Sequence, residues 1–391
     1  MRSVLVYVQH LLGIGHLMRT RQIAEALAGH GFDVHLVTGG MPIGGRMPRG
    51  VRTVQLPPIR VADASFTPLR DAAFEPIDDA YRSRRREMLL AAYAEAAPCA
   101  VLFETFPFGR RALRFELLPL LERIDATRPR PLVVSSIREI LQLQQKPERE
   151  REMLAWAAQW FDAIFVHGDP RFARFEDTFS FADELVPPVH YTGFVSGRAI
   201  AARDGPGGAR DEVVVSAGGG GVGVDLLATA LAAQPLSSVS DRTWRVLAGP
   251  NITDAGFDRL RSMAGPTAIV ERSRSDFAGV LERAFVSISQ AGYNTTLDVL
   301  ASGARPVFVP FTGNGETEQR ARGNRLAELN VAIVVDDRTL TPLTLAQAVD
   351  GAATRGAWGR WDFASDGAAQ TAVLLARLLD DTTRDERRSA A

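Results

Sequence analysis

Short apolar runs alternate with amphipathic stretches along most of the chain, and this alternation is typical of a parallel α/β sheet. In the N-terminal half, stretches such as 16–29 and 81–97 carry apolar residues at helical spacing between the apolar runs. The strands expected in this half lie at residues 3–9, 33–38, 51–56, 99–103, 132–136 and 163–167. Strands and helices that alternate in this way predict a doubly wound sheet with right-handed crossovers.

A second series of the same kind follows a stretch at 196–211 that is rich in glycine, alanine and charge. Its expected strands lie at residues 212–216, 243–247, 267–270, 285–289, 306–309 and 331–335, and a closing helix is expected at 366–379. We therefore expect two similar α/β domains joined by a linker. The predicted boundaries are a first domain at 1–196, a linker at 197–211, a second domain at 212–379, whose last helix could pack back on the first domain, and a flexible tail at 380–391.

Composition limits the class of protein. A chain of 391 residues with 46% apolar and 23% charged residues is long enough for two globular domains. Its net charge of −1 gives no electrostatic reason to expect nucleic acid as a partner. Cys99 is the only cysteine, which excludes a disulfide scaffold or a multi-cysteine zinc site. The first strand begins almost at once and no apolar run could span a bilayer, so we expect a cytoplasmic protein with at most peripheral membrane contact.

The first candidate site is Gly13-Ile14-Gly15-His16, at a turn between a strand and a helix. Gly15 allows a ligand to approach the backbone closely. His16 lies near the helix N-terminus, where the positive end of the dipole favours a neutral imidazole that can act as a base. The same pattern also fits a simple turn with a surface histidine.

Other polar residues of the first half follow predicted strands. Glu104 and Arg138 come directly after two of them, and the carboxyl ends of parallel strands are where ligands bind in open α/β sheets. The arginines of the helix expected at 81–97 should form a solvated face, with contact to an anionic acceptor or a membrane surface as the alternative; they are Arg82, Arg84, Arg85 and Arg86.

In the second half, glycine-rich turns mark two candidate anion sites. The tetraglycine Gly218–Gly221 lies between a strand and a helix, where stacked N–H groups bind anions, although a merely flexible turn is the alternative. Gly292 follows another strand and leads into a helix that Gly303 ends. Asn294 and Thr295 open this helix, whose free N–H groups suit a phosphate. Asp298 lies about one and a half turns further on, within reach of ribose hydroxyls, and an ordinary crossover is the alternative.

Glu318 and Gln319 begin a later helix. A carboxylate and an amide there suit sugar hydroxyls, which both donate and accept hydrogen bonds. Alternatively, the carboxylate simply complements the helix dipole. The chain has no His-Glu-x-x-His motif, no cysteine pair and no Asp-x-Asp pair, so we expect no metal site. It also lacks the Gly-x-Ser-x-Gly elbow of serine hydrolases.

Taken together, these motifs resemble those of a GT-B glycosyltransferase of the MurG-like kind (family 28 and its relatives). The segments 289–310 and 316–332 show the family's order of a glycine-led helix with a carboxylate, a strand that ends in proline, and an acid/Gln pair before an Asn-containing helix. The N-terminal Gly-x-Gly-His-x-x-Arg resembles a branch of predicted MurG-like transferases; its residues here are Gly13, Gly15, His16 and Arg19. The resemblance implies an α/β GT-B fold, in which two Rossmann-like, doubly wound domains face an interdomain cleft.

The resemblance also implies a role for each candidate residue. The donor would be a nucleotide sugar, with a UDP-sugar as the expected form, held mainly by the second domain. Asp298 would bind the ribose, Arg272 would lie at the base edge, and Glu318 and Gln319 would contact the donor sugar. The diphosphate would be bound by Gly219, Gly220, Gly221, Gly292, Asn294, Thr295 and, through a strand-end segment that lacks the family's Asn-Pro, Arg198. His16 would be the catalytic base, aided by Glu104, with Gly15, Arg19 and Arg138 on the acceptor side.

The implied reaction is inverting sugar transfer without a metal or other cofactor, to a small-molecule or lipid-linked acceptor that the sequence does not identify. Two other enzymes of this fold remain open. One is a nucleotide-sugar hydrolase like that of the pseudaminic acid pathway, and the other is a non-hydrolysing 2-epimerase. A sugar-nucleotide-binding protein without catalysis is the third alternative.

Overall fold

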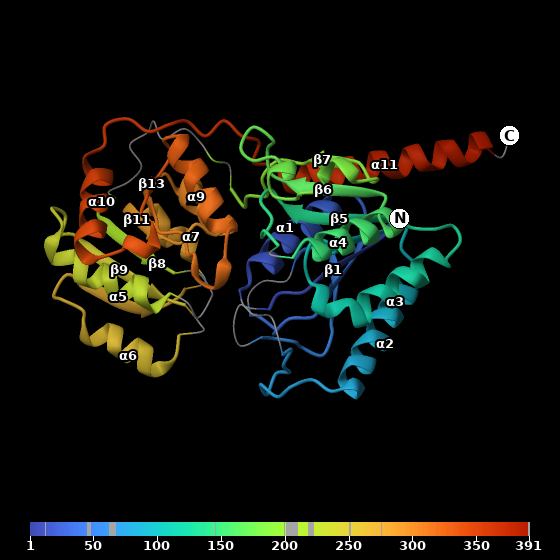
Figure 1. Cartoon of the computed structure of the whole chain (residues 1–391), viewed down its shortest axis with the longest axis horizontal. Helices are drawn as coiled ribbons and strands as arrows, with labels where there is room; N and C mark the ends of the chain where they lie inside the picture. The colour runs from blue at the N-terminus through green and yellow to red at the C-terminus, as the bar shows by residue number, and fades with distance from the viewer. Residues whose placement is uncertain are drawn as a thin grey trace. The chain divides into compact units, whose positions relative to one another are not determined.

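The computed structural model of the protein describes residues 1–11, 13–44, 48–61, 68–144, 146–198, 200, 210–217, 223–249, 252–274 and 276–389. Two compact α/β units make up the chain (Figure 1). The first consists of Met1–Val195 together with Phe363–Ala391, and the second of Ser196–Asp362. Most of the predicted linker and the whole tetraglycine lie outside the described residues.

The first unit is built on a seven-stranded parallel sheet with the strand order β3-β2-β1-β4-β5-β6-β7. The strands are β1 (Ser3–Val8), β2 (Asp33–Thr38), β3 (Val51–Gln55), β4 (Ala100–Glu104), β5 (Leu132–Arg138), β6 (Ala163–His167) and β7 (Val189–Tyr191). The helices are α1 (Gly15–Gly29), α2 (Asp79–Ala96), α3 (Arg114–Asp125), α4 (Pro147–Trp160) and α11 (Gly367–Ser389).

The alternation of side chains along β1 shows how both faces of this sheet are covered. Leu5 and Tyr7 pack in a core with residues of α2 and α3, whereas Val4 and Val6 pack in a second core with residues of α1 and α11. Parallel strands covered on both faces are continuous apolar runs rather than alternating ones. This is why the apolar runs of the sequence locate most strands correctly.

The second unit repeats this architecture with six parallel strands in the order β10-β9-β8-β11-β12-β13. The strands are β8 (Glu212–Ser216), β9 (Thr243–Ala248), β10 (Ala268–Arg272), β11 (Ala284–Ser289), β12 (Arg305–Phe308) and β13 (Ile333–Val334). The helices are α5 (Val224–Ala233), α6 (Asp254–Ser262), α7 (Phe277–Glu282), α8 (Tyr293–Ser302), α9 (Glu318–Glu328) and α10 (Pro342–Thr354).

Each sheet reverses its strand order once, between β1 and β4 in the first unit and between β8 and β11 in the second. The two sheets therefore have the doubly wound order that the sequence predicted. Ligands of such folds bind beyond the carboxyl ends of the strands at this switch point. The residues at the ends of β1, β4, β8 and β11 are thus the first to examine for function.

The C-terminal helix α11 belongs to the first unit, where Figure 1 shows it in red. Its residues Ala372, Leu375 and Leu379 are buried in the same core as Leu27 of α1. The helix continues to Ser389, past residue 379 where the closing helix was expected to end. The chain returns beside the point where it left, because Phe194 N–H donates to Ala364 O at 2.8 Å.

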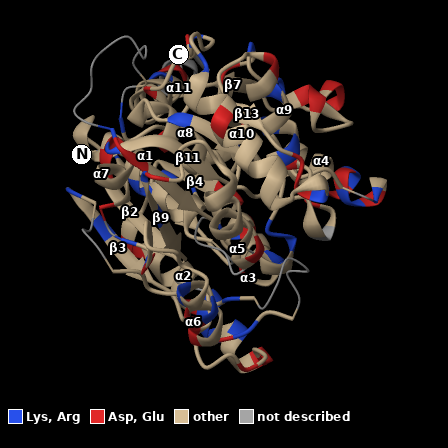
Figure 2. Ribbon diagram, turned by 90° about the vertical axis from the view of Figure 1, so that its left-hand side faces the viewer, with Lys and Arg blue, Asp and Glu red and all other residues tan. Residues whose placement is uncertain are grey.

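Charged residues of both signs are interspersed on outer helices such as α4 and α6 (Figure 2). One arginine does not follow the expected pattern. Arg85 of α2 is completely buried, so the prediction of a solvated arginine face is wrong at this position. Among the described helices, none combines the length and apolar character that crossing a membrane requires.

Candidate functional site

His16 and Glu104 meet at the switch point of the first sheet. His16 lies in the first turn of α1, which follows β1, and Glu104 is the last residue of the neighbouring strand β4. His16 Nδ1 is 2.8 Å from Glu104 Oε1. The structure therefore brings the two predicted catalytic residues together.

Glu104 is buried and surrounded by donors. Arg19, one turn after His16 on α1, forms an ion pair with Glu104 Oε1, and Thr105 Oγ1 donates to the same oxygen at 3.2 Å. Ser136 Oγ donates to Oε2 at 3.1 Å. Burial alone would raise the pKa of Glu104, but the charge of Arg19 and the hydrogen bond from His16 outweigh it and hold the pKa well below its usual range. Glu104 is therefore a carboxylate at neutral pH.

This carboxylate determines the state of His16. A carboxylate can only accept hydrogen bonds, so the His16 proton lies on Nδ1, and Nε2 carries the lone pair. Burial lowers the pKa of His16 well below 6.5, and the positive charges of Arg110 and Arg138 lower it further against the opposing effect of Glu104. The imidazole is therefore neutral at neutral pH and can accept a proton at Nε2.

Two guanidinium groups belong to the same region. Arg110 Nε donates to Gln9 O at 2.9 Å, and burial followed by the charge of Arg138 lowers the pKa of Arg110 to about 10. Arg138 ends β5 and was predicted from that position, whereas Arg110 was not predicted. Sequence offered one signal for Arg110, since it lies in the loop after β4.

The prediction for Arg19 needs a correction. We expected it on the acceptor side, but its side chain is only 1% exposed and is paired with Glu104. It keeps Glu104 ionised from inside the protein rather than facing a ligand. Gly15 begins α1 and is half-buried next to His16.

At the switch point of the second sheet, helix α8 begins directly after β11. Gly292 is its N-cap residue, and the helix ends at Gly303, whose φ of 73° is in the left-handed region, as the sequence predicted. Asn294 and Thr295 lie in the first turn. The start of an α-helix directs backbone N–H groups and the positive end of its dipole outward, which makes it suitable for an anion. The tetraglycine residues Gly219, Gly220 and Gly221 lie outside the described residues.

Three buried hydroxyl groups lie near this helix start. Ser216 and Ser289 are register partners at the carboxyl ends of β8 and β11, and Thr296 is in α8. Among the described residues, none of these three hydroxyls has a hydrogen-bond partner. A buried hydroxyl without a partner costs free energy, which a bound polar ligand or water can recover.

Asp298, also in α8, has an unusual ionisation. Burial raises its pKa to about 6, and the charge of Arg198 opposes this only in part. Within the described part of the chain, no hydrogen bond reaches its carboxylate. Asp298 is thus a half-buried carboxyl group whose ionised form would be stabilised by hydrogen bonds from hydroxyl donors. Arg198 itself forms an exposed ion pair with Glu282.

The other predicted donor-site residues have partners inside the protein. Glu318 begins α9, is buried, and pairs with Arg322 at 2.9 Å; Arg322 Nη1 donates in turn to Ala291 O at 3.0 Å. Gln319 Oε1 accepts a hydrogen bond from Phe311 N–H at 3.2 Å. A contact between the amide nitrogen of Gln319 and a donor sugar stays a prediction. Glu318 therefore supports the turn before α8 in this structure, instead of presenting a free carboxylate. Arg322, missed in the sequence, was detectable because it lies four residues after Glu318 on a helix.

Arg272 ends β10 and is also held by the protein. Its guanidinium donates to Ile252 O and to Asp254 Oδ1, each at 2.5 Å, and its central carbon lies 4.3 Å from the ring centre of Phe257. These contacts attach the end of β10 to the loop before α6 and to α6 itself. A role at a base edge stays a prediction. Across the described ranges, no group of three or more His, Cys, Asp or Glu side chains could hold a metal ion.

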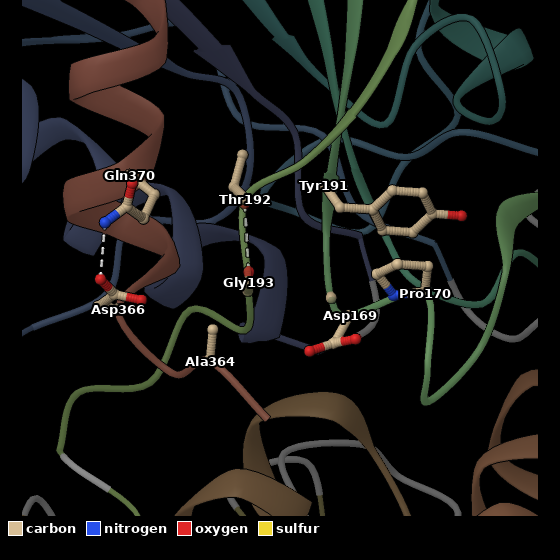
Figure 3. A pocket seen from close by; sticks show the side chains of 9 residues that line it. Asp169, Pro170, Tyr191, Thr192, Gly193, Ala364, Asp366 and Gln370 are labelled. Atoms are coloured by element: carbon tan, nitrogen blue, oxygen red, sulfur yellow. Dashed lines mark hydrogen bonds between the residues drawn. The ribbon is translucent and has the colours of Figure 1, made fainter. Parts of the chain in front are cut away.

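The first unit also has a pocket of about 400 Å³ (Figure 3). It lies where the ends of β6 and β7 meet the start of α11, and Gln370 Nε2 donates to Asp366 Oδ2 at 2.8 Å on one side. Asp169 opposite is paired with Arg171 at 2.7 Å. The residues that line the pocket are Gly168, Asp169, Pro170, Tyr191, Thr192, Gly193, Ala364, Asp366 and Gln370.

Comparison with known proteins agrees with this architecture. Residues 249–356 match the model of the glycosyltransferase family 28 C-terminal domain. No curated protein sequence matches the chain. Three similar solved structures are those of MurG from Acinetobacter baumannii, of a UDP-glucosyltransferase from Polygonum tinctorium, and of UGT2 from Phytolacca americana with UDP-2-fluoro-glucose and pterostilbene.

These likenesses extend over the whole chain at low identity. MurG is 13% identical with a TM-score of 0.56, over 97% of this chain and 100% of that one. The Polygonum enzyme is 14% identical with a TM-score of 0.61, over 97% and 99%. The Phytolacca enzyme is 16% identical with a TM-score of 0.57, over 97% and 94%.

The fold is therefore that of the GT-B glycosyltransferases. Within it, the second unit carries a family 28 C-terminal domain. Together these findings confirm the GT-B fold that the sequence motifs implied, with a match to the family 28 C-terminal domain in the second unit.

Proposed function

We propose that this protein transfers a sugar from a nucleotide-sugar donor, with UDP as the nucleotide, to a nucleophilic acceptor, with inversion at the anomeric carbon. The observation that carries the proposal is the pair formed by His16 and Glu104 at the switch point of the first sheet. A neutral histidine whose proton is fixed on Nδ1 by a buried carboxylate is suited to general-base catalysis at Nε2.

In the proposed reaction, His16 Nε2 removes the proton of the acceptor while the acceptor attacks the anomeric carbon. The bond from that carbon to the diphosphate breaks in the same step, which inverts its configuration. Glu104 stabilises the imidazolium that forms, because the charge of that ring then lies against a carboxylate. The nucleoside diphosphate leaves with the negative charge.

The second unit offers the chemistry that a leaving diphosphate needs. The N-terminus of α8 and the hydroxyls of Ser216 and Ser289 would bind phosphate oxygens. Asp298 would accept hydrogen bonds from the ribose, and Gln319 would contact the sugar. The Phytolacca structure, which holds a UDP-sugar analogue, supports UDP as the donor nucleotide. A helix terminus and Arg198 would balance the charge of the diphosphate, so we expect transfer without a divalent metal.

The first experiment is a thermal-shift screen of the purified protein against UDP-, GDP-, dTDP- and ADP-sugars, because binding to the folded state raises its apparent stability. Turnover is then measured with the best donor and a panel of acceptors, with and without EDTA. We expect UDP-sugars to give the largest shift, and release of UDP to depend on acceptor and on His16 but not on EDTA.

The other candidate activities give different results in the same assays. Rapid release of UDP and free sugar without acceptor would indicate a hydrolase. Incorporation of solvent deuterium at C2 of the sugar would indicate an epimerase. Binding with no turnover, unchanged in His16→Ala, would leave a sugar-nucleotide-binding protein.

A further inference from the structure

A chain of buried polar side chains continues from Glu104 across the first sheet. Ser136 of β5 is the register partner of Glu104, and its Oγ lies 3.1 Å from Glu104 Oε2. The same Oγ is 2.7 Å from Nε2 of His167, the last residue of β6, and His167 Nδ1 is 2.8 Å from Oγ1 of Thr192, which follows β7. Ser136, His167 and Thr192 are each less than 5% exposed.

We propose that Ser136 and His167 are positioning residues that hold Glu104, and through it His16, in the orientation for proton transfer. This inference rests on the proposed function of the His16–Glu104 pair. Neither residue would touch the substrate. Their effect would pass through the Oε2 oxygen of Glu104.

The direction of the hydrogen bonds in this chain follows from the charge of Glu104. Because a carboxylate only accepts, the single proton of Ser136 points to Oε2. Ser136 Oγ must then accept from His167, so His167 carries its proton on Nε2. Its Nδ1 in turn accepts the hydroxyl proton of Thr192. Every donor in the chain thus points toward Glu104.

His167 is suited to hold this arrangement without changing its charge. Burial lowers the pKa of His167 to about 3, and the charge of Arg19 contributes in the same direction. It therefore stays neutral with one N–H at working pH. Neither His167 nor Glu104 takes up a proton readily. The hydrogen bonds from His167 through Ser136 therefore restrain the carboxylate and do not conduct protons.

The chain complements the contacts on the other oxygen of Glu104. Oε1 interacts with His16, Arg19 and Thr105. The bond from Ser136 holds the second oxygen, Oε2, so that both oxygens of the carboxylate are restrained. A hydroxyl alone could rotate, but the ring of His167, bonded at both nitrogens, restrains it. The rate of proton transfer falls steeply when the base is misdirected, so restraint of Glu104 would increase kcat.

The tautomers can be measured on the free protein by ¹⁵N NMR of the histidine rings. We expect His167 to be protonated on Nε2 and His16 on Nδ1, with no titration of His167 between pH 5.5 and 8. In Ser136→Ala, the His16 ring signals should show more of the Nε2-protonated tautomer, because Glu104 is then held through Oε1 alone. An Nδ1-protonated His167, or a His16 signal unchanged in Ser136→Ala, would overturn the proposal whether or not the protein is a transferase.

Kinetics provide the second readout. We expect Ser136→Ala and His167→Leu each to lower kcat about tenfold with an unchanged KM for the donor. His167→Gln, which keeps a donor near the position of Nε2, should recover most of the loss. The double variant should be no slower than the single ones, because both interrupt one chain. Additive losses, or no difference between Leu and Gln at position 167, would contradict the proposal.

Thr192→Val provides a milder variant if the inner substitutions fail to fold. It removes the outermost hydroxyl while keeping the shape of the side chain, at a residue that also lines the pocket of Figure 3. We expect His167 to keep its Nε2 proton and kcat to fall less than in Ser136→Ala. A larger loss than in Ser136→Ala would mean that Thr192 acts by another route and would overturn the order of the chain.

Discussion

His16 and Glu104 lie 88 positions apart in the sequence, yet Nδ1 of one and Oε1 of the other are 2.8 Å apart at the switch point of the first sheet. The carboxylate is kept ionised by a buried arginine, and the imidazole is kept neutral by burial and by two nearby guanidinium groups. Glu104 is therefore ionised and can accept the Nδ1 proton of His16, while His16 is neutral and can act as a base at Nε2. This relationship makes the proposed reaction testable at several positions.

Glu104→Gln should lower kcat by about two to four orders of magnitude, because an amide does not enforce the Nδ1 proton of His16 or stabilise an imidazolium. Donor binding, measured by thermal shift, should change little. Glu122→Gln, on the exposed face of α3, is the matched control and should behave like the unmodified protein. If Glu104→Gln retained full turnover while folded, the pair would not be the catalytic base.

The pH dependence of kcat, measured at saturating donor so that donor affinity does not contribute, should show a plateau from about pH 6 to 8. The base is active when neutral, and its pKa is below the ordinary 6.5, so activity falls only on the acid side of that value. Arg138→Gln removes one of the charges that lower this pKa and should move the acid limb to higher pH. A limb centred near pH 7 in the unmodified protein, or no movement in Arg138→Gln, would contradict this assignment of the base.

Asp298→Asn should raise the stability of the free protein at neutral pH and weaken donor binding. The folded-state pKa of about 6 exceeds the ordinary 3.8, so the unfolded chain ionises first as pH rises. Stability from this group is therefore lost between pH 3.8 and 6, and the loss of about 1–3 kcal/mol is complete above pH 6. The Asn variant should not show this loss.

Thermal unfolding from pH 4 to 8 tests the first part of that expectation, and donor titration tests the second. An ionised Asp298 accepts ribose hydroxyls best, so donor affinity should increase as pH rises through 6 and should fall roughly tenfold or more in the Asn variant. Equal donor affinity in both proteins would exclude Asp298 from the donor site.

Glu116→Ala should destabilise the first unit by about 3–5 kcal/mol, since it leaves a buried arginine without its partner. Arg85 Nε and Nη2 donate to the two oxygens of Glu116 at 2.8 and 2.7 Å, and Tyr7 donates to Oε1 at 2.5 Å. Urea unfolding, with Glu122→Gln again as the control on α3, measures the difference. A loss below about 1 kcal/mol, typical of an exposed pair, would contradict the burial of this network.

The sequence predicted those features that depend on neighbouring residues. The strands at Asp33–Thr38, Ala163–His167 and Glu212–Ser216 have the bounds expected from apolar runs, and α8 ends at Gly303 because only a residue that tolerates positive φ suits that position. His16 and Glu104 could be placed at one edge of the sheet because each follows a predicted strand, and their catalytic roles stay predictions.

Features that depend on distant partners were missed or misassigned. Arg85 looked like one of several surface arginines, since its carboxylate partner lies 31 residues away on another helix. Ser136 and His167 gave no local signal, because each is an ordinary strand residue until the sheet register is known. That register places Ser136 opposite Glu104 and two positions before Arg138, the partner of His167. Arg19 was assigned to the acceptor from its motif, whereas its position one turn after His16 directs it to Glu104.

The return of α11 to the first unit has a practical consequence for engineering. Val195 and Asp366 form a β-bridge, so the chain leaves the first unit and re-enters it at adjacent points. Residues 196–362 are thus an inserted cassette, and chimeras should exchange that interval as a whole in order to keep the first unit, with His16 and Glu104, intact. A cut after residue 195 would instead remove the helix that covers α1, and would leave the apolar side of Leu27 exposed to water.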